Sequence, residues 1–126
     1  MYEVGTAISV RAFHVMPGME GPEGERHSHD YKIELLVERS EVDERGMVCD
    51  LDVLDDVLRR TADRVCDADL ETMVPFGPAD GVTVEAFARW VHSAVADSAR
   101  RAGAEVLAVR VWESKEAFGG FRASLI

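Results

Sequence analysis

The chain has 126 residues, of which 47% are hydrophobic, and this predicts one folded domain over residues 1–126 rather than a disordered segment. Its formal net charge of −10 at pH 7 argues against nucleic acid and against an anionic membrane surface as partners. No apolar stretch approaches the roughly 18 residues of a membrane span, and the first residues lack a basic and then apolar signal peptide, so we expect a cytoplasmic protein.

The first half of the chain predicts two strands followed by a helix. Apolar residues alternate over residues 4–16 and again over residues 29–41, which is the pattern of half-buried strands. Residues 17–26 hold two prolines and three glycines and are expected to form the loop between them. Asp50 then precedes apolar residues at helical spacing, so it is expected to cap the first helix.

The second half predicts a loop, a helix and two more strands. Residues 71–82 are rich in Pro and Gly and are expected to be a loop. A second helix is expected to begin at Thr83 and to be closed by Gly103. Alternation returns over residues 105–113 and 117–125. The order ββααββ predicts an α+β fold, a four-stranded antiparallel sheet with both helices on one face.

Three histidines suggest a metal centre. His27 and His29 stand two residues apart at the start of the second predicted strand, so their side chains are expected on the same face. His14 closes the first strand and completes a set of three. Zinc held by three histidines, with one position left for water or substrate, is typical of a catalytic site. The alternative is that one or two of the three are ordinary surface histidines.

Five segments resemble a known family. They are Ala12-Phe13-His14, His27-Ser28-His29-Asp30-Tyr31, Gly46-Met47-Val48-Cys49-Asp50-Leu51, Thr83-Val84-Glu85 and Val109-Arg110-Val111-Trp112-Glu113-Ser114. In the same order they are similar to Ala-Ala-His, His-Gly-His-Asn-Tyr, Gly-Met-Val-x-Asp-Phe, Pro-Thr-x-Glu and Val-x-Val-x-Glu-Thr of the 6-pyruvoyl-tetrahydropterin synthase and 6-carboxy-tetrahydropterin synthase family. The resemblance implies the tunnelling fold, zinc on the three histidines and a reduced pterin as the small-molecule substrate.

Two departures from the family pattern concern the catalytic residues. The family's thiol falls at Glu23, and one branch of the family carries Glu there. Glu23 is therefore either the base of the reaction or a solvated loop carboxylate. The family's Asp-His pair falls at Cys66 and Asp67. Cys66 is either a thiolate nucleophile or a core residue, and Asp67 is a candidate proton carrier or partner of a metal ligand.

The resemblance also implies a substrate-binding set. Glu113 matches the Glu that anchors the 2-amino-4-oxo edge of a pterin, a planar array of donors that suits a carboxylate. On pattern alone, Glu113 is the polar end of an apolar strand. Thr83 and Glu85 are candidates to contact ligand from a neighbouring subunit, and Thr83 is equally a plain helix N-cap.

Three functions follow as hypotheses. The first is a zinc-dependent lyase or cyclase acting on a reduced pterin, with Glu23 in place of the usual Cys. The second is a zinc cyclase, lyase or isomerase of a bacterial natural-product pathway with a non-pterin substrate, which the missing Asp-His pair favours. The third is a non-catalytic, zinc-stabilised oligomer that binds a ligand. The resemblance further implies an oligomeric barrel, a homohexamer built as a dimer of trimers, which would remove the edge strands of the sheet.

Overall fold

A computed structural model describes residues 1–77 and 80–126. Strands β1 (Tyr2–His14), β2 (His27–Arg39), β3 (Val106–Trp112) and β4 (Phe118–Ser124) form one sheet in the order β1-β2-β3-β4, and each neighbouring pair is antiparallel. The predicted α+β fold with a four-stranded antiparallel sheet is therefore confirmed. The strand bounds differ from the expected ones by one or two residues.

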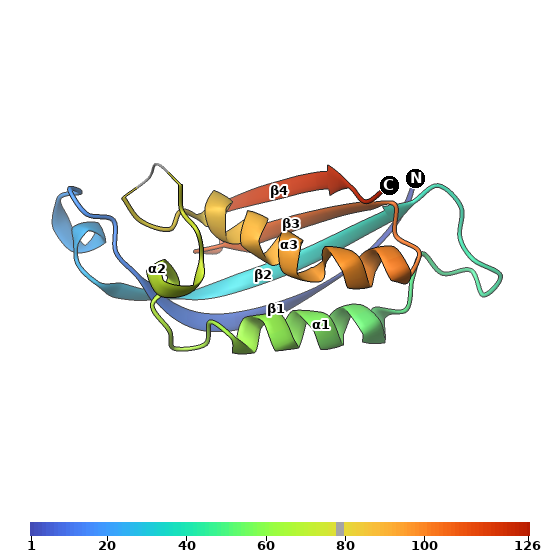
Figure 1. Ribbon diagram of the computed structural model, residues 1–126, viewed down its shortest axis with the longest axis horizontal. Coiled ribbons are helices and arrows are strands. Elements are labelled where there is room, and N and C mark those ends of the chain that lie inside the picture. Colours follow the sequence, from blue (N-terminus) through green and yellow to red (C-terminus); the bar gives the residue numbers. More distant parts are fainter. Residues whose placement is uncertain (78–79) are drawn as a thin grey trace.

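Two long helices cover one face of this sheet (Figure 1). Helix α1 (Leu51–Asp63) packs on β1, and helix α3 (Val84–Arg101) packs on β3 and β4. Each begins where the sequence predicts, because the Asp50 carboxylate accepts from the backbone N–H of Asp52 and the Thr83 hydroxyl accepts from that of Ala86. Gly103 follows α3 with φ of 104°, the left-handed conformation that ends many helices.

The core lies between the sheet and the two helices. Alternate residues of β1, β2 and β3 point toward the helices and include the buried side chains of the sheet, whereas those of β4 are only partly buried. The period of two therefore sets which side chains enter the core. The largest of the fully buried side chains belong to Tyr31, Ile33, Leu35, Leu54, Leu58, Leu70, Phe87 and Leu107.

The predicted loop over residues 71–82 is only partly correct. A one-turn helix, α2 (Leu70–Met73), lies at the start of this segment, and its first residue, Leu70, is fully buried. Four residues are too few to show helical periodicity, so the sequence pattern could not reveal this element. Residues 78–79, which also fall in the predicted loop, lie outside the described residues. The first loop of the chain likewise contains a short 3₁₀ helix, η1 (Gly21–Gly24).

Candidate metal centre and active site

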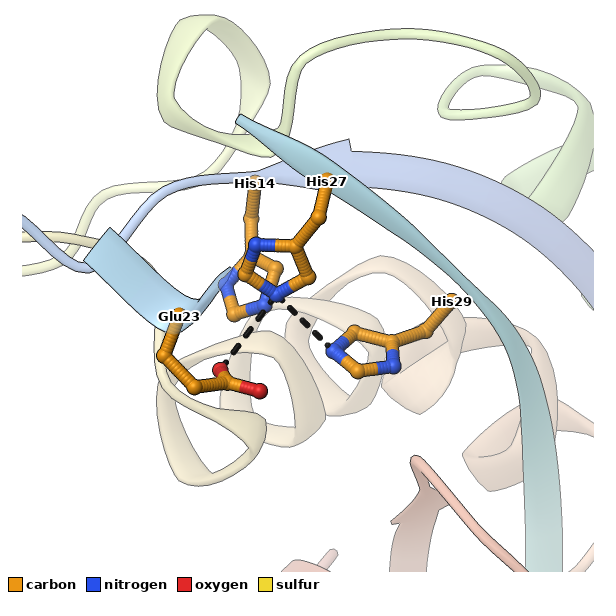
Figure 2. Close-up of side chains that lie close together, drawn as sticks. All are labelled: His14, Glu23, His27 and His29. Atoms are coloured by element: carbon orange, nitrogen blue, oxygen red, sulfur yellow. Dashed lines mark hydrogen bonds and ion pairs between the residues drawn. The ribbon is translucent and has the colours of Figure 1, made fainter. Parts of the chain in front are cut away.

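The antiparallel pairing of β1 and β2 brings the three histidines together. His14 lies directly opposite His27, and His29 lies opposite Ala12 two residues further along β2. All three side chains therefore project from the helix-covered face at one end of the sheet. The ring centroid of His14 lies 4.4 Å from that of His27 and 5.1 Å from that of His29. Figure 2 shows the rings turned toward one another, with Glu23 beside them.

Backbone carbonyls orient two of the three rings. Nδ1 of His14 lies 3.2 Å from the carbonyl oxygen of Val82, and Nδ1 of His27 lies 2.7 Å from that of Glu25. A carbonyl can only accept, so each Nδ1 carries the hydrogen and each Nε2 presents a lone pair. An acceptor on the other ring nitrogen is usual for histidines that bind metal through Nε2.

The distances within the group suit a small cation. His27 Nε2 lies 3.1 Å from His29 Nε2 and 3.3 Å from Glu23 Oε2. Two nitrogens bound to tetrahedral zinc at about 2.0–2.1 Å lie about 3.3 Å apart. The ligand atoms of His14, Glu23, His27 and His29 all lie within 4.8 Å of one another. The donor set therefore fits zinc in spacing and in chemistry.

His14 gives a further sign that the group binds a cation. Among the described residues, its buried Nε2 has no hydrogen-bond partner, although such atoms are nearly always satisfied. Burial lowers the pKa of His14 below its ordinary value, and the neighbouring His27 and His29 lower it further. The ring is thus held neutral, with a lone pair available to a metal.

Glu23 reaches the histidines from the loop between β1 and β2. It belongs to η1 and lies four residues before His27, and its side chain is about half exposed at 52%. The carboxylate therefore touches the metal-binding group while keeping access to solvent. The structure therefore places the Glu23 carboxylate beside the three histidines.

Cys66 and Asp67 lie elsewhere on the surface. The Asp67 carboxylate pairs with Arg11 at 2.8 Å, and the Asp67 backbone N–H donates to the Arg11 carbonyl, so this segment follows the outer edge of β1. In the described part of the chain, the group of metal-ligand atoms includes neither residue. The alternative of Cys66 as a core residue is wrong, because its side chain is exposed. Cys66 lies three residues beyond Asp63, the last residue of α1, and no longer belongs to the apolar face of that helix.

Glu113 lies at the same end of the sheet as the histidines. It follows β3, is half-buried, and shares the helix-covered face with Val109 and Val111 because it continues their alternation. Tyr31 connects it to the metal group: burial raises the pKa of the Tyr31 hydroxyl, and the charges of Glu113, Glu71 and Glu23 raise it further. The phenol of Tyr31 is thus held protonated, and its buried ring has its centroid 5.4 Å from that of His29.

Thr83 and Glu85 lie at the start of α3. The Thr83 hydroxyl accepts from the Ala86 N–H at 3.1 Å, so its predicted role as an N-cap is confirmed. Glu85 is exposed on the first turn of the helix. Within the described chain neither belongs to the metal-ligand group, so contact with a ligand bound by another subunit stays a prediction.

Sequence reasoning missed one carboxylate of the site. Glu71, in α2, accepts hydrogen bonds from the backbone N–H groups of Val15 and Val82, which adjoin His14 in the chain and in space. The only signal in the sequence is an acidic residue after Asp69 and Leu70, and it lies in a segment expected to be a loop. The packing of α2 against the end of β1 is what gives Glu71 its position.

The antiparallel sheet, its one-sided helices and the histidines at one end together define a tunnelling-fold protein. The chain belongs to the 6-pyruvoyl tetrahydropterin synthase family, whose model matches residues 3–123. This confirms the family resemblance carried by the five sequence segments. A comparison with curated proteins gives no match.

Solved structures of the family share the fold at low sequence identity. The synthase of Plasmodium falciparum has a TM-score of 0.75 and 13% identity, covering 98% of this chain and 98% of that chain. The synthase of Caenorhabditis elegans has a TM-score of 0.72 and 19% identity, covering 98% and 96%. A Plasmodium vivax synthase whose catalytic glutamate is replaced by alanine has a TM-score of 0.72 and 12% identity, covering 98% and 99%.

Proposed function

We propose that this chain is a zinc-dependent lyase or cyclase that acts on the side chain of a reduced pterin. Family membership supports a lyase of the pterin-synthase kind. The observation that carries the zinc assignment is the convergence of His14, His27 and His29, with the unpartnered, buried Nε2 of His14 among them. When bound, zinc supplies Lewis acidity to a substrate oxygen, which favours enolisation or retro-aldol cleavage.

Glu23 is the base in this proposal. Its carboxylate lies 3.3 Å from His27 Nε2 and is half exposed, so it can take a proton from a substrate carbon held next to the metal. The Plasmodium vivax synthase, in which a glutamate is named as a catalytic residue, gives a precedent for this residue type in the family. The same carboxylate would later return the proton to the product.

Glu113 is the proposed anchor for the pterin ring. Its half-buried carboxylate at the end of β3 can accept two parallel hydrogen bonds from the 2-amino group and the ring N–H of the substrate. Tyr31 lies between Glu113 and the histidines, with its ring centroid 5.4 Å from that of His29. Its protonated hydroxyl would lie between Glu113, which anchors the pterin ring, and the histidines and Glu23, where the side chain reacts.

A second candidate function keeps the zinc and changes the substrate. The positions that match the family's Asp-His pair hold Cys66 and Asp67, and Asp67 is paired with Arg11 away from the histidines. An enzyme without that pair needs another route for the proton, and a substrate other than a pterin would explain its loss. The third hypothesis, a non-catalytic zinc-stabilised oligomer, predicts no turnover of any substrate.

The proposal also includes the assembly and the location of the protein. β1 and β4 are the outer strands of the sheet, and pairing them between subunits would close a barrel. We propose a homohexamer, a dimer of trimers, in which Thr83 and Glu85 approach the site of a neighbouring subunit. None of the helices in the described residues is long and apolar enough to span a bilayer. The cytoplasm is the proposed location.

Turnover by the zinc-loaded protein tests the proposed function. Dihydroneopterin and its phosphate esters are incubated with the protein, and pterin products are separated by chromatography with fluorescence detection. We expect consumption that is lost in His29→Ala and after removal of zinc by a chelator. Zinc binding without consumption of any dihydropterin would instead favour the substrate-switched candidate. Turnover of any substrate that Glu23→Gln abolishes would overturn the third hypothesis.

A further inference from the structure

Glu71 holds together two segments that flank His14. Its Oε1 accepts from the backbone N–H of Val15 at 3.0 Å and from that of Val82 at 3.3 Å. Val15 is the first residue after β1, and Val82 lies just before α3, so neither N–H belongs to a strand or helix ladder. One carboxylate oxygen thus satisfies two backbone donors that the regular elements leave over.

These bonds close a ring that includes a metal-binding histidine. His14 Nδ1 donates to the carbonyl of Val82 at 3.2 Å, the N–H of Val82 donates to Glu71, and Val15 is the residue bonded to His14. Movement of Val82 would therefore turn the His14 ring, while movement of Val15 would shift its backbone. Glu71 restrains both.

Close backbone packing leaves this ring little freedom. A side chain at Gly81 would place its Cβ 2.1 Å from the carbonyl oxygen of Val15, so the loop before α3 lies directly against the end of β1. Only glycine permits that approach. Leu70, the residue before Glu71, is fully buried and fixes α2 in the core. The carboxylate is consequently presented from a rigid element rather than from a free loop.

We propose that Glu71 is a positioning residue of the metal centre, which keeps the Nε2 of His14 directed at the metal through the Val82 carbonyl. The inference rests on the proposed function in one respect, that the histidine group binds zinc. Glu71 itself does not belong to the group of ligand atoms formed by the described residues. Its contribution is therefore to the affinity and geometry of the site.

Zinc affinity in three variants tests this role. Glu71→Ala removes both acceptors, Glu71→Asp shortens the side chain by one methylene so that it cannot reach both donors, and Glu71→Gln keeps a carbonyl oxygen in place. We expect the dissociation constant for zinc, measured by competition with a chromophoric chelator, to rise roughly 10- to 100-fold in Glu71→Ala and Glu71→Asp, as when other groups that orient a metal ligand are lost. Glu71→Gln should stay close to the wild type.

Asp43→Ala is a matched control. The Asp43 carboxylate also accepts two backbone N–H groups, those of Arg45 and Met47, at 2.8 and 3.0 Å. It lies in the loop between β2 and α1, at the opposite end of the molecule (Figure 1). Its loss should lower stability without changing zinc affinity. The visible absorption spectrum of the cobalt-loaded protein should change in Glu71→Ala and Glu71→Asp and stay unchanged in Asp43→Ala.

The outcomes separate the two proposals. A wild-type chain that binds no zinc would overturn the proposed function and this inference together. Tight zinc binding by the wild type, Glu71→Asp and Glu71→Ala alike would overturn the positioning role alone. An equal loss of affinity in Glu71→Gln and Glu71→Asp would also overturn it, because hydrogen-bond geometry would then not be what Glu71 contributes. Should Glu71→Ala fail to fold, Glu71→Asp and Glu71→Gln carry the test.

Discussion

His27 and His29 bring their Nε2 atoms to 3.1 Å because residues two apart on β2 project from the same face. Nδ1 of His27 donates to the Glu25 carbonyl, so the Nε2 of His27 presents a lone pair toward His29. Without a metal, a hydrogen on His29 Nε2 must fill the space between the two nitrogens. A cation that binds both rings through Nε2 requires that hydrogen to move to Nδ1 of His29, so zinc should select the Nδ1–H tautomer of this ring. Zinc binds only neutral imidazole, so its affinity should weaken as the pH falls.

Loss of one histidine ligand should abolish tight zinc binding. His29→Ala leaves two imidazoles, and we expect the protein to lose zinc during dialysis, as measured by metal analysis. The fourth histidine supplies the control, since His92 is buried between α3 and β3, where its Nε2–H donates to the Leu107 carbonyl at 3.1 Å. His92→Gln should retain zinc. Equal zinc content in His29→Ala and the wild type would contradict the three-histidine site.

Glu23→Gln should separate catalysis from metal binding. The amide keeps the shape of the side chain but cannot accept a proton, so we expect kcat to fall about 10²- to 10⁴-fold with zinc content unchanged. Glu20→Gln, one turn earlier in the same exposed loop, is the matched control and should behave as wild type. If Glu23→Gln lost zinc instead, Glu23 would be a metal ligand rather than the base.

His92 should make stability depend on pH. Burial lowers the pKa of His92, and the neighbouring Arg89 lowers it further, so between that pKa and about 6.5 the unfolded chain binds more protons than the folded one. The free energy of unfolding of metal-free protein should therefore decrease as the pH falls below about 6.5. Urea unfolding at about pH 7.5 and about pH 5.5 should show a smaller decrease in His92→Gln. An identical decrease in both proteins would refute this.

Thr83 can be tested for a role beyond capping α3. Thr83→Ala removes the acceptor of the Ala86 N–H and should lower the free energy of unfolding by about 1 kcal/mol. Thr83→Asn restores a cap and should restore that stability. If Thr83 also contacts substrate, Thr83→Asn will fold normally yet bind the pterin more weakly. Unchanged affinity in Thr83→Asn would leave Thr83 with the structural role alone.

The assembly is directly measurable. Closure of the sheet through β1 and β4 predicts a particle of six chains of 13.9 kDa each in size-exclusion chromatography with light scattering. We expect that mass to persist on dilution to micromolar concentration, because a closed barrel leaves no free strand edges. A mass of one chain at every concentration would contradict the hexamer.

Local patterns were sufficient to predict the fold and which histidines belong to the cluster at one end of the sheet. Alternation with a period of two predicted the strands and placed His27 with His29 on one face, whereas Glu113 was singled out by the family resemblance alone. Contacts made by short or irregular segments could not be predicted in this way. The segment that holds Cys66 and Asp67 follows the edge of β1 because the Asp67 N–H donates to the Arg11 carbonyl and the Phe13 N–H donates to the Ala68 carbonyl. No sequence spacing encodes these bonds.

Glu71 shows the same limit at the site itself. The four residues of α2 carry no periodicity. The Glu71 carboxylate gains its two hydrogen bonds only because the end of β1 and the loop before α3 lie on either side of it. A charged side chain that bonds to distant backbone groups depends on tertiary packing. The pairing register of His14 with His27 has the same origin, since it depends on how the intervening loop folds.

The most direct test of the account is calorimetric titration of the zinc-loaded protein with a dihydropterin, with Glu113→Ala as the paired variant. We predict saturable heat in the wild type that Glu113→Ala abolishes, with equal zinc content in both proteins. That result would establish a pterin site built from the zinc centre and the Glu113 carboxylate. An absence of binding to the zinc-loaded wild type, or equal binding by Glu113→Ala, would contradict it.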